Sequence, residues 1–160
     1  MKKLLILAVF IASLQIAKGQ VSFSVPLGFS SNKVPTMGAN LQANIHGFII
    51  GAGLDGQMSR KVVNGNFYWS KIGKAFNLSD LNSLEISVGM GDYRCSSDVK
   101  SLNQGLGLIN VQYVHRLALR EDGAFFASVT TTKEFTMITG GFRFIFGSGN
   151  KRNGCPSTWQ

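Results

Sequence analysis

Short segments in which apolar and polar residues alternate recur along most of the chain. Residues 21–29 (VSFSVPLGF) carry an apolar residue at nearly every second position, and residues 38–46 (GANLQANIH) repeat the pattern. Successive side chains of a β-strand point to opposite faces, so a period of two predicts strands with one apolar and one polar face. Eight segments are candidates for such strands: residues 21–29, 38–45, 47–56, 67–76, 84–92, 105–117, 123–131 and 135–147.

The composition of the polar faces indicates which face of each strand points inward. A soluble β-sandwich turns its apolar faces inward, whereas a small membrane barrel turns them outward. The polar faces here are rich in Gly, Ser, Asn and Gln and poor in Lys and Glu, which is typical of a narrow, hydrogen-bonded lumen. The sequence therefore predicts an all-β fold, a single antiparallel up-and-down β-barrel of about eight strands. The polar candidates for its lumen are Glu85, Asn110, Gln112, Arg116 and Arg143, and the three charged ones are able to pair there.

Aromatic residues and connection lengths add two expectations. Aromatic side chains at strand ends are expected to form girdles where the barrel meets the membrane–water interface: Phe29, Phe67, Tyr68, Trp69, Phe76, Tyr93 and Phe146. The connections after the first, third and fifth strands are long, as outer loops are, whereas residues 132–134 form a short connection that breaks this pattern. The longest polar loop supplies the candidates for contact with a partner: Tyr93, Arg94, Asp98 and Lys100.

The N-terminus has the organisation of a cleaved export signal. Lys2 and Lys3 precede an apolar run over residues 4–12, and the small residues Ala17 and Gly19 form the cleavage site. We expect residues 1–19 to be the signal peptide, 20–147 the barrel domain and 148–160 a flexible tail. No later apolar run reaches the roughly 18 residues of a membrane helix. Loss of Lys2, Lys3 and Lys18 lowers the net charge from +8 to +5. Because these charges are dispersed, a nucleic-acid partner is not expected.

The mature chain resembles the small eight-stranded outer-membrane barrels of Gram-negative bacteria. The resemblance rests on the export junction, the alternating strands and the last strand, GGFRFIF, which ends at Phe146. In having Gln20 directly after the cleavage site, the chain resembles exported proteins of Bacteroidetes. The resemblance implies location in the outer membrane, contact with its lipid, and recognition of Phe146 by the assembly machinery. The chain departs from the family in the 14 residues that follow Phe146.

The residues that could carry chemistry are few. An exported pair of cysteines forms a disulfide by default, but the barrel places Cys95 in an outer loop and Cys155 in a tail at the opposite end, too far apart to bridge. His46 and His115 map to the end opposite the outer loops, and neither has an evident catalytic neighbour. We therefore expect no catalytic, metal or cofactor site.

Three Gly-x-Gly pairs complete the inventory. They lie at residues 51/53, 89/91 and 105/107, and none opens a helix or precedes a Lys-Ser/Thr pair, so they are not nucleotide-binding loops. We expect them to make room inside the lumen.

The sequence favours a non-enzymatic outer-membrane barrel that acts through its outer loops in surface interaction, envelope structure or support of a surface complex, with a possible protein partner there. The first alternative is a secreted or periplasmic all-β binding module. The second is a lipid-modifying outer-membrane barrel enzyme.

Overall fold

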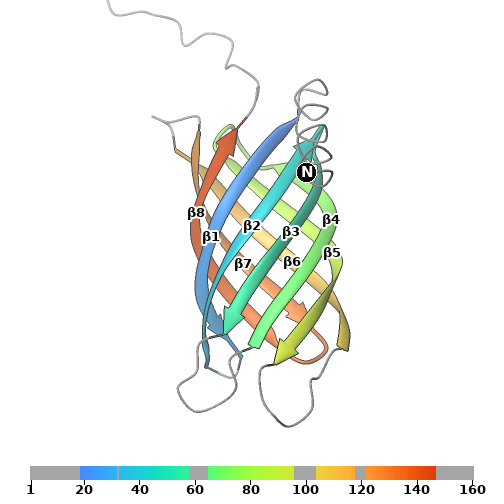
Figure 1. The fold of residues 1–160 in the computed structure, drawn as a ribbon. Helices are drawn as coiled ribbons and strands as arrows, with labels where there is room; N and C mark the ends of the chain where they lie inside the picture. The colour runs from blue at the N-terminus through green and yellow to red at the C-terminus, as the bar shows by residue number, and fades with distance from the viewer. Residues whose placement is uncertain (1–18, 32, 58–64, 96–103, 118–121, 147–160) are drawn as a thin grey trace, which may run out of the picture.

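Eight antiparallel strands close into a barrel in which each strand pairs with its neighbours in the chain (Figure 1). The structure is a computed structural model, and it describes residues 19–31, 33–57, 65–95, 104–117 and 122–146. The barrel closes where β1 and β8 pair from Val21↔Phe146 to Ser30↔Met137. The strands are β1 (Gln20–Ser30), β2 (Pro35–Ile45), β3 (Phe48–Gln57), β4 (Gly65–Asn77), β5 (Asn82–Cys95), β6 (Gln104–Arg116), β7 (Gly123–Thr132) and β8 (Thr136–Phe146). This confirms the predicted fold class.

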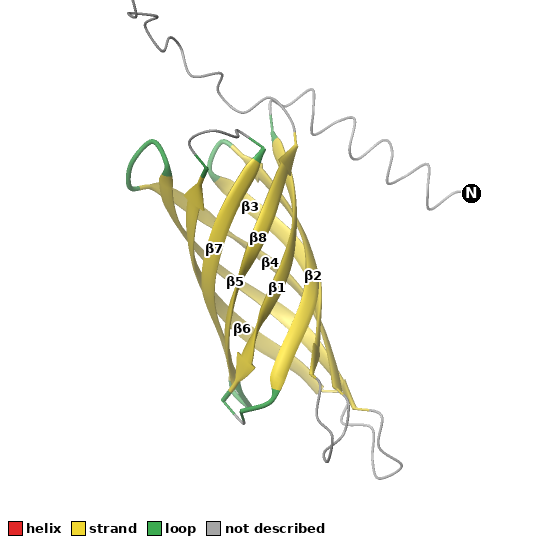
Figure 2. Ribbon diagram, turned by 90° about the vertical axis from the view of Figure 1, so that its left-hand side faces the viewer, coloured by secondary structure: helices red, strands yellow, loops and turns green. Residues whose placement is uncertain are grey.

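The two ends of the barrel differ. One end, here called the termini end, holds the start of β1, the end of β8 and the connections after β2, β4 and β6. The other, the loop end, holds the connections after β1, β3, β5 and β7; Figure 2 shows both ends from the side. Most strands extend beyond their predicted bounds. In particular, β5 runs through Tyr93 and Arg94, so the expectation that these residues belong to a loop is wrong.

The turn between β2 and β3 is built from two residues in the left-handed region. His46 has φ 53° and Gly47 has φ 85°. Two-residue hairpins favour this geometry because its twist matches that of the flanking strands. Asn44 Oδ1 accepts a hydrogen bond from the Gly47 amide at 2.9 Å. Local turn chemistry therefore fixes the register of β2 against β3.

The alternation seen in the sequence becomes an alternation between the inside and the outside of the barrel. All eight strands point large apolar side chains outward, where they are exposed. This outer apolar belt consists of Phe23, Val25, Leu27, Phe29, Met37, Leu41, Phe48, Ile50, Leu54, Tyr68, Ile72, Phe76, Ile86, Val88, Met90, Ile109, Val111, Tyr113, Phe125, Val129, Ile138, Phe144 and Phe146. The buried positions between them include many polar and charged side chains, the reverse of a soluble sandwich.

The interior has layers of different chemistry. Polar side chains fill its middle and extend toward the termini end, whereas an apolar cluster fills the loop end: Phe67, Leu106, Leu108, Phe135 and Met137, with Trp69 and Tyr93 packed against it. A smaller cluster of Val114, Ala124 and Phe126 lies near the termini end. Within the described ranges, no helix is long and apolar enough to cross a membrane.

Candidate functional site

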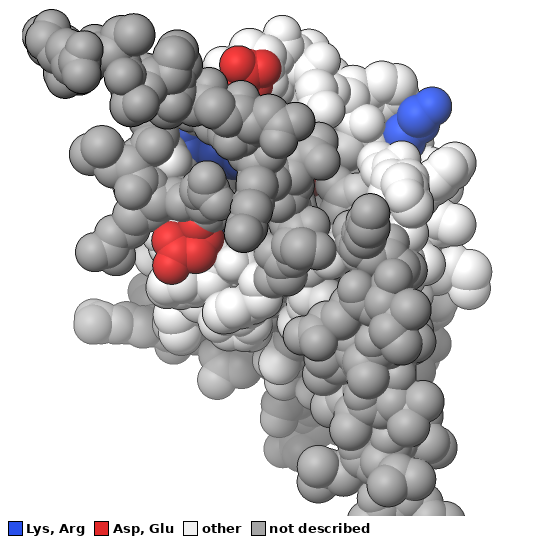
Figure 3. Space-filling model, turned by 90° about the horizontal axis from the view of Figure 1, so that it is seen from above, with Lys and Arg blue, Asp and Glu red and all other residues white. Residues whose placement is uncertain are grey.

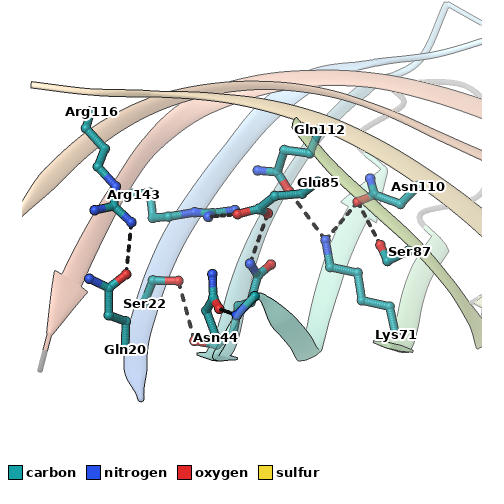
Figure 4. A network of polar contacts seen from close by, with 12 residues as sticks. Gln20, Ser22, Asn44, Lys71, Glu85, Ser87, Asn110, Gln112, Arg116 and Arg143 are labelled. Carbon is teal, nitrogen blue, oxygen red and sulfur yellow. Dashed lines mark hydrogen bonds and ion pairs between the residues drawn. The ribbon is translucent and has the colours of Figure 1, made fainter. Parts of the chain in front are cut away.

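An ion pair joins β5 and β8 inside the lumen, in the half nearer the termini end (Figure 4). Arg143 of β8 donates from Nη1 to Glu85 Oε1 at 2.7 Å and from Nη2 to Glu85 Oε2 at 2.9 Å. Gln42 of β2 donates to the same carboxylate at 2.9 Å. Glu85 and Arg143 are both about 95% buried. Paired hydrogen bonds from a guanidinium compensate a buried carboxylate better than one contact does, so this geometry ties β2, β5 and β8 together.

Lys71 of β4 occupies the next part of the lumen. Its Nζ donates to Asn110 Oδ1 at 2.8 Å and to Gln112 Oε1 at 3.4 Å, both on β6. The same ammonium lies 5.3 Å from the centre of the Trp69 ring. Amide oxygens and an aromatic face thus stabilise the buried cation. Asn110 also accepts from Ser87 Oγ at 3.3 Å, which extends the network along β5.

Arg116 lies apart from this network, at the termini end. It donates to Gln20 Oε1 at 3.0 Å and is partly exposed, so it does not join the Glu85–Arg143 pair. A cavity of about 30 Å³ opens between Arg116, Arg143, Gln42 and neighbouring residues. A water molecule takes about 30 Å³ in the liquid, so the cavity fits a water or two and not an organic ligand. Of the predicted lumen residues, the structure places Glu85, Asn110, Gln112 and Arg143 inside and Arg116 at the mouth.

The apolar cluster at the loop end corrects part of the aromatic prediction. Phe67, Trp69 and Tyr93 point into the lumen and not toward an interface. Phe67 and Phe135 meet edge to face with ring centres 5.2 Å apart, and Tyr93 lies 5.8 Å from Phe135. Trp69 Nε1 donates to the buried Asp55 at 2.6 Å. The alternation of faces along β4 and β5 could have indicated this. Phe67 and Trp69 lie an even number of residues from the inward Lys71, and Tyr93 lies an even number from the inward Glu85, so they share its face.

Outward aromatics gather mainly at the termini end. Phe48, Phe76, Tyr113, Phe125, Phe144 and Phe146 are all exposed there. Phe29 and Tyr68 are the exposed aromatics of the girdle prediction near the loop end. The described strands therefore carry a dense outer aromatic ring at one end and a sparse one at the other.

Two of the three glycine pairs face inward. A Cβ atom at Gly53 would overlap the Trp69 ring, and one at Gly91 would overlap the Phe67 ring. These glycines therefore make room for the apolar cluster. Gly105 and Gly107 instead face outward into open space, so the expectation that they line the lumen is wrong. Their even-numbered neighbours Leu106 and Leu108 fill the interior in their place.

The described rim of the loop end carries a small polar cluster. Arg94 Nε donates to Asp92 Oδ2 at 2.9 Å, and its guanidinium carbon lies 5.5 Å from the centre of the Tyr68 ring. Arg94 is exposed, whereas Tyr93 points inward. Asp98 and Lys100, the other two contact candidates, lie outside the described residues.

The two histidines lie at the termini end. His46 occupies the β2–β3 turn, and His115 Nδ1 lies 2.7 Å from Asn82 Oδ1, which also accepts a hydrogen bond from the Tyr113 hydroxyl at 2.7 Å. Seen from that end, the visible charges of both signs are scattered (Figure 3). The described ranges contain no cluster of three His, Cys, Asp or Glu residues that could hold a metal.

Known structures share this architecture at low sequence identity. The N-terminal β-barrel domain of Pseudomonas aeruginosa OprF is 14% identical with a TM-score of 0.67, and the match covers 79% of this chain and 97% of that one. A de novo designed transmembrane β-barrel is 12% identical with a TM-score of 0.65, covering 79% and 95%. The Yersinia pestis outer membrane protein Ail, in a phospholipid bilayer nanodisc, is 10% identical with a TM-score of 0.53, covering 80% and 99%.

The chain has the fold of an eight-stranded transmembrane β-barrel. No protein-family model and no curated protein matches the sequence. At these identities the likeness concerns the fold alone.

Proposed function

We propose that this protein is a non-enzymatic outer-membrane β-barrel that acts through its loop end. The observation that carries the proposal is the outer apolar belt, to which every strand contributes. Soluble monomers rarely expose a contiguous apolar patch beyond a few hundred Å². A belt that encircles the barrel while Glu85, Lys71 and Arg143 lie inside is a surface suited to lipid.

A secreted or periplasmic binding module fits this surface poorly. In water, more than half of the surface of Leu27, Phe48, Ile72, Met90 and Ile138 would stay in contact with solvent. Cell fractionation separates the two proposals. We expect the protein to stay in the membrane pellet after carbonate extraction and to migrate faster on a gel when unheated than after boiling. Full release into the soluble fraction would rule out the membrane barrel.

The same geometry argues against a catalytic role. Side chains fill the described lumen, and His115 has an amide partner in place of the acid or nucleophile that hydrolysis needs. We expect no acyl hydrolase or transferase activity in vesicles that contain an outer-leaflet lipid. Such activity, lost in His115→Ala but kept in Lys74→Ala, would establish the lipid-modifying enzyme instead.

Two parts of the proposal concern export and assembly. Residues 1–18 and 147–160 lie outside the described residues, so the signal peptide and the tail remain predictions from the sequence. The exposed Phe146 at the end of β8 is the residue proposed for recognition by the assembly machinery. We expect the mass of the mature protein to place its first residue at Gln20.

Surface contact is proposed for the loop end because the described termini end offers no site for an organic ligand. The termini end holds a cavity the size of a water molecule or two, whereas Arg94 and Asp92 are accessible charged groups beside the longest predicted loop. A protein partner there is expected to lose affinity in Arg94→Ala, with Lys74→Ala as the control at the opposite end.

A further inference from the structure

An apolar groove interrupts the outer surface near the loop end, between β1 and β2. Its walls are Leu27 and Phe29 on β1 and Pro35 and Met37 on β2, and Gly28 and Thr36 form its floor. The groove is shallow and open on its outer side. Leu27, Phe29 and Met37 also belong to the outer apolar belt, so the groove is a hollow within the surface proposed to face lipid.

The turn that joins the two walls carries a positive charge. Lys33 lies in this turn, in the left-handed region with φ 59°, and is exposed. The neighbouring β7–β8 turn is attached to it, because the Ser31 amide donates to Thr136 O at 2.7 Å and the Thr136 amide donates to Ser31 Oγ at 3.3 Å. That second turn carries the exposed Lys133. Lys133 Nζ lies 3.8 Å from Glu134 Oε1. Because the two turns hold two lysines and one glutamate, together they carry one net positive charge.

We propose that the groove and the two lysine-bearing turns form a binding site for one lipid with an anionic phosphate headgroup. The acyl chain would lie along Leu27, Phe29 and Met37, and the phosphate would lie beside Lys33 and Lys133 at the membrane surface. An apolar chain matches the groove, and an anionic head matches the turns above it. This inference rests on the proposed membrane location and goes beyond it by naming one lipid site.

Native mass spectrometry of the full-length barrel tests the site. The barrel is released from nanodiscs of phosphatidylcholine with one-tenth phosphatidylglycerol of the same acyl chains. We expect one phosphatidylglycerol to be retained in preference to phosphatidylcholine. The double variant K33Q/K133Q is expected to lower this preference by about fivefold per lysine at low ionic strength. Met37→Trp fills the groove and is expected to abolish the retained lipid.

Two variants outside the proposed site serve as controls. Lys74→Gln removes an exposed lysine at the termini end, and Val88→Trp enlarges a belt residue on the opposite side, so both are expected to retain the lipid. An unchanged preference in K33Q/K133Q would overturn the proposal. So would a protein dimer that disappears in Met37→Trp, or full displacement of the lipid by inorganic phosphate. Heat-modifiable migration of each variant on a gel shows whether the barrel has folded. Loss of the lipid from a folded barrel therefore concerns the lipid site and not the membrane proposal.

Discussion

At the scale of residues, the barrel keeps its buried charges in specific polar contacts. Asp55, Lys71, Glu85 and Arg143 are the buried charged residues of the described strands, two of each sign. Each has a bonded partner: Trp69 for Asp55, Asn110 for Lys71, and the two-fold pair between Glu85 and Arg143. Removing one member of a buried pair costs more than removing both, because the remaining charge stays buried and unpaired.

The ion pair gives the first prediction. Arg143→Met leaves Glu85 without its guanidinium and is expected to lower the free energy of unfolding by about 3–5 kcal/mol. The double variant E85Q/R143M is expected to regain part of that loss, because no unpaired carboxylate remains. Urea unfolding in lipid vesicles measures both. Glu85→Gln completes the set of variants. If the separate losses of Arg143→Met and Glu85→Gln add up to the loss of the double variant, the two residues do not act as a pair.

The glycines give a second residue-scale prediction with a built-in control. Gly53→Ala places a methyl group against the Trp69 ring and is expected to cost about 1–3 kcal/mol of folding stability. Gly107→Ala adds the same methyl group to open space outside and is expected to change stability by less than about 0.5 kcal/mol. Equal effects at the two sites would contradict the assignment of inner and outer faces.

At the scale of elements, the β7–β8 turn closes the loop end from within. Thr132 Oγ1 accepts hydrogen bonds from the Glu134 and Phe135 amides at 3.2 and 3.1 Å and donates to Phe135 O at 3.0 Å. These contacts hold the turn so that Phe135 packs against Phe67 and Tyr93. A connection too short to be a typical outer loop therefore supplies an apolar cap for the lumen.

The cap gives a third prediction. Phe135→Ala is expected to cost about 3–5 kcal/mol of folding stability, because it opens a cavity among packed side chains. Phe29→Ala, at an outward position of the same end, is expected to cost less because lipid can fill the space. Urea unfolding of both variants in the same vesicles measures the two losses of stability. A larger loss for Phe29→Ala would argue against the cap.

The alternation predicted all eight strands, but in some segments it did not show which side chains point into the lumen. Phe67, Tyr68 and Trp69 are consecutive aromatics, so this part of β4 shows no contrast between its faces. Only the fixed parity with Lys71, supported by the hydrogen bond to Asp55, assigns Phe67 and Trp69 to the interior. Likewise Gly105 and Gly107 face outward because they share a parity with the exposed Ile109.

The sequence predicted which residues of the candidate site face the lumen, because facing depends only on alternation along a strand. Glu85, Asn110, Gln112 and Arg143 lie inside because each alternates with outward apolar residues. The actual pairing was not predictable, because contacts such as Gln42 with Glu85 depend on barrel closure and strand stagger. Nor did local sequence indicate the groove between β1 and β2, which arises from the spacing of side chains across two paired strands.

In the molecule as a whole, the barrel separates the start of β1 and the end of β8 from its longest predicted loop. β5 ends at Cys95 at the loop end, whereas β8 ends at Phe146 at the termini end, nine residues before Cys155. If lipid surrounds the belt, a tail that stays on the side where β8 ends would be separated from Cys95 by the membrane. We expect no disulfide between them within one chain. Non-reducing peptide mapping of the folded protein checks this, and a Cys95–Cys155 bridge would contradict the topology.

Lipid contact of the outer apolar belt is the property on which the proposed function depends. Spin labels at Ile50, Ile72, Val88 and Ile109, one at a time in a chain with both cysteines replaced by serine, test it through accessibility in lipid vesicles. We expect high accessibility to oxygen, which dissolves in the bilayer, and low accessibility to a water-soluble nickel chelate. A label at the exposed Lys133 should show the reverse. Ready access of the nickel chelate to all four belt positions would show that the belt faces water.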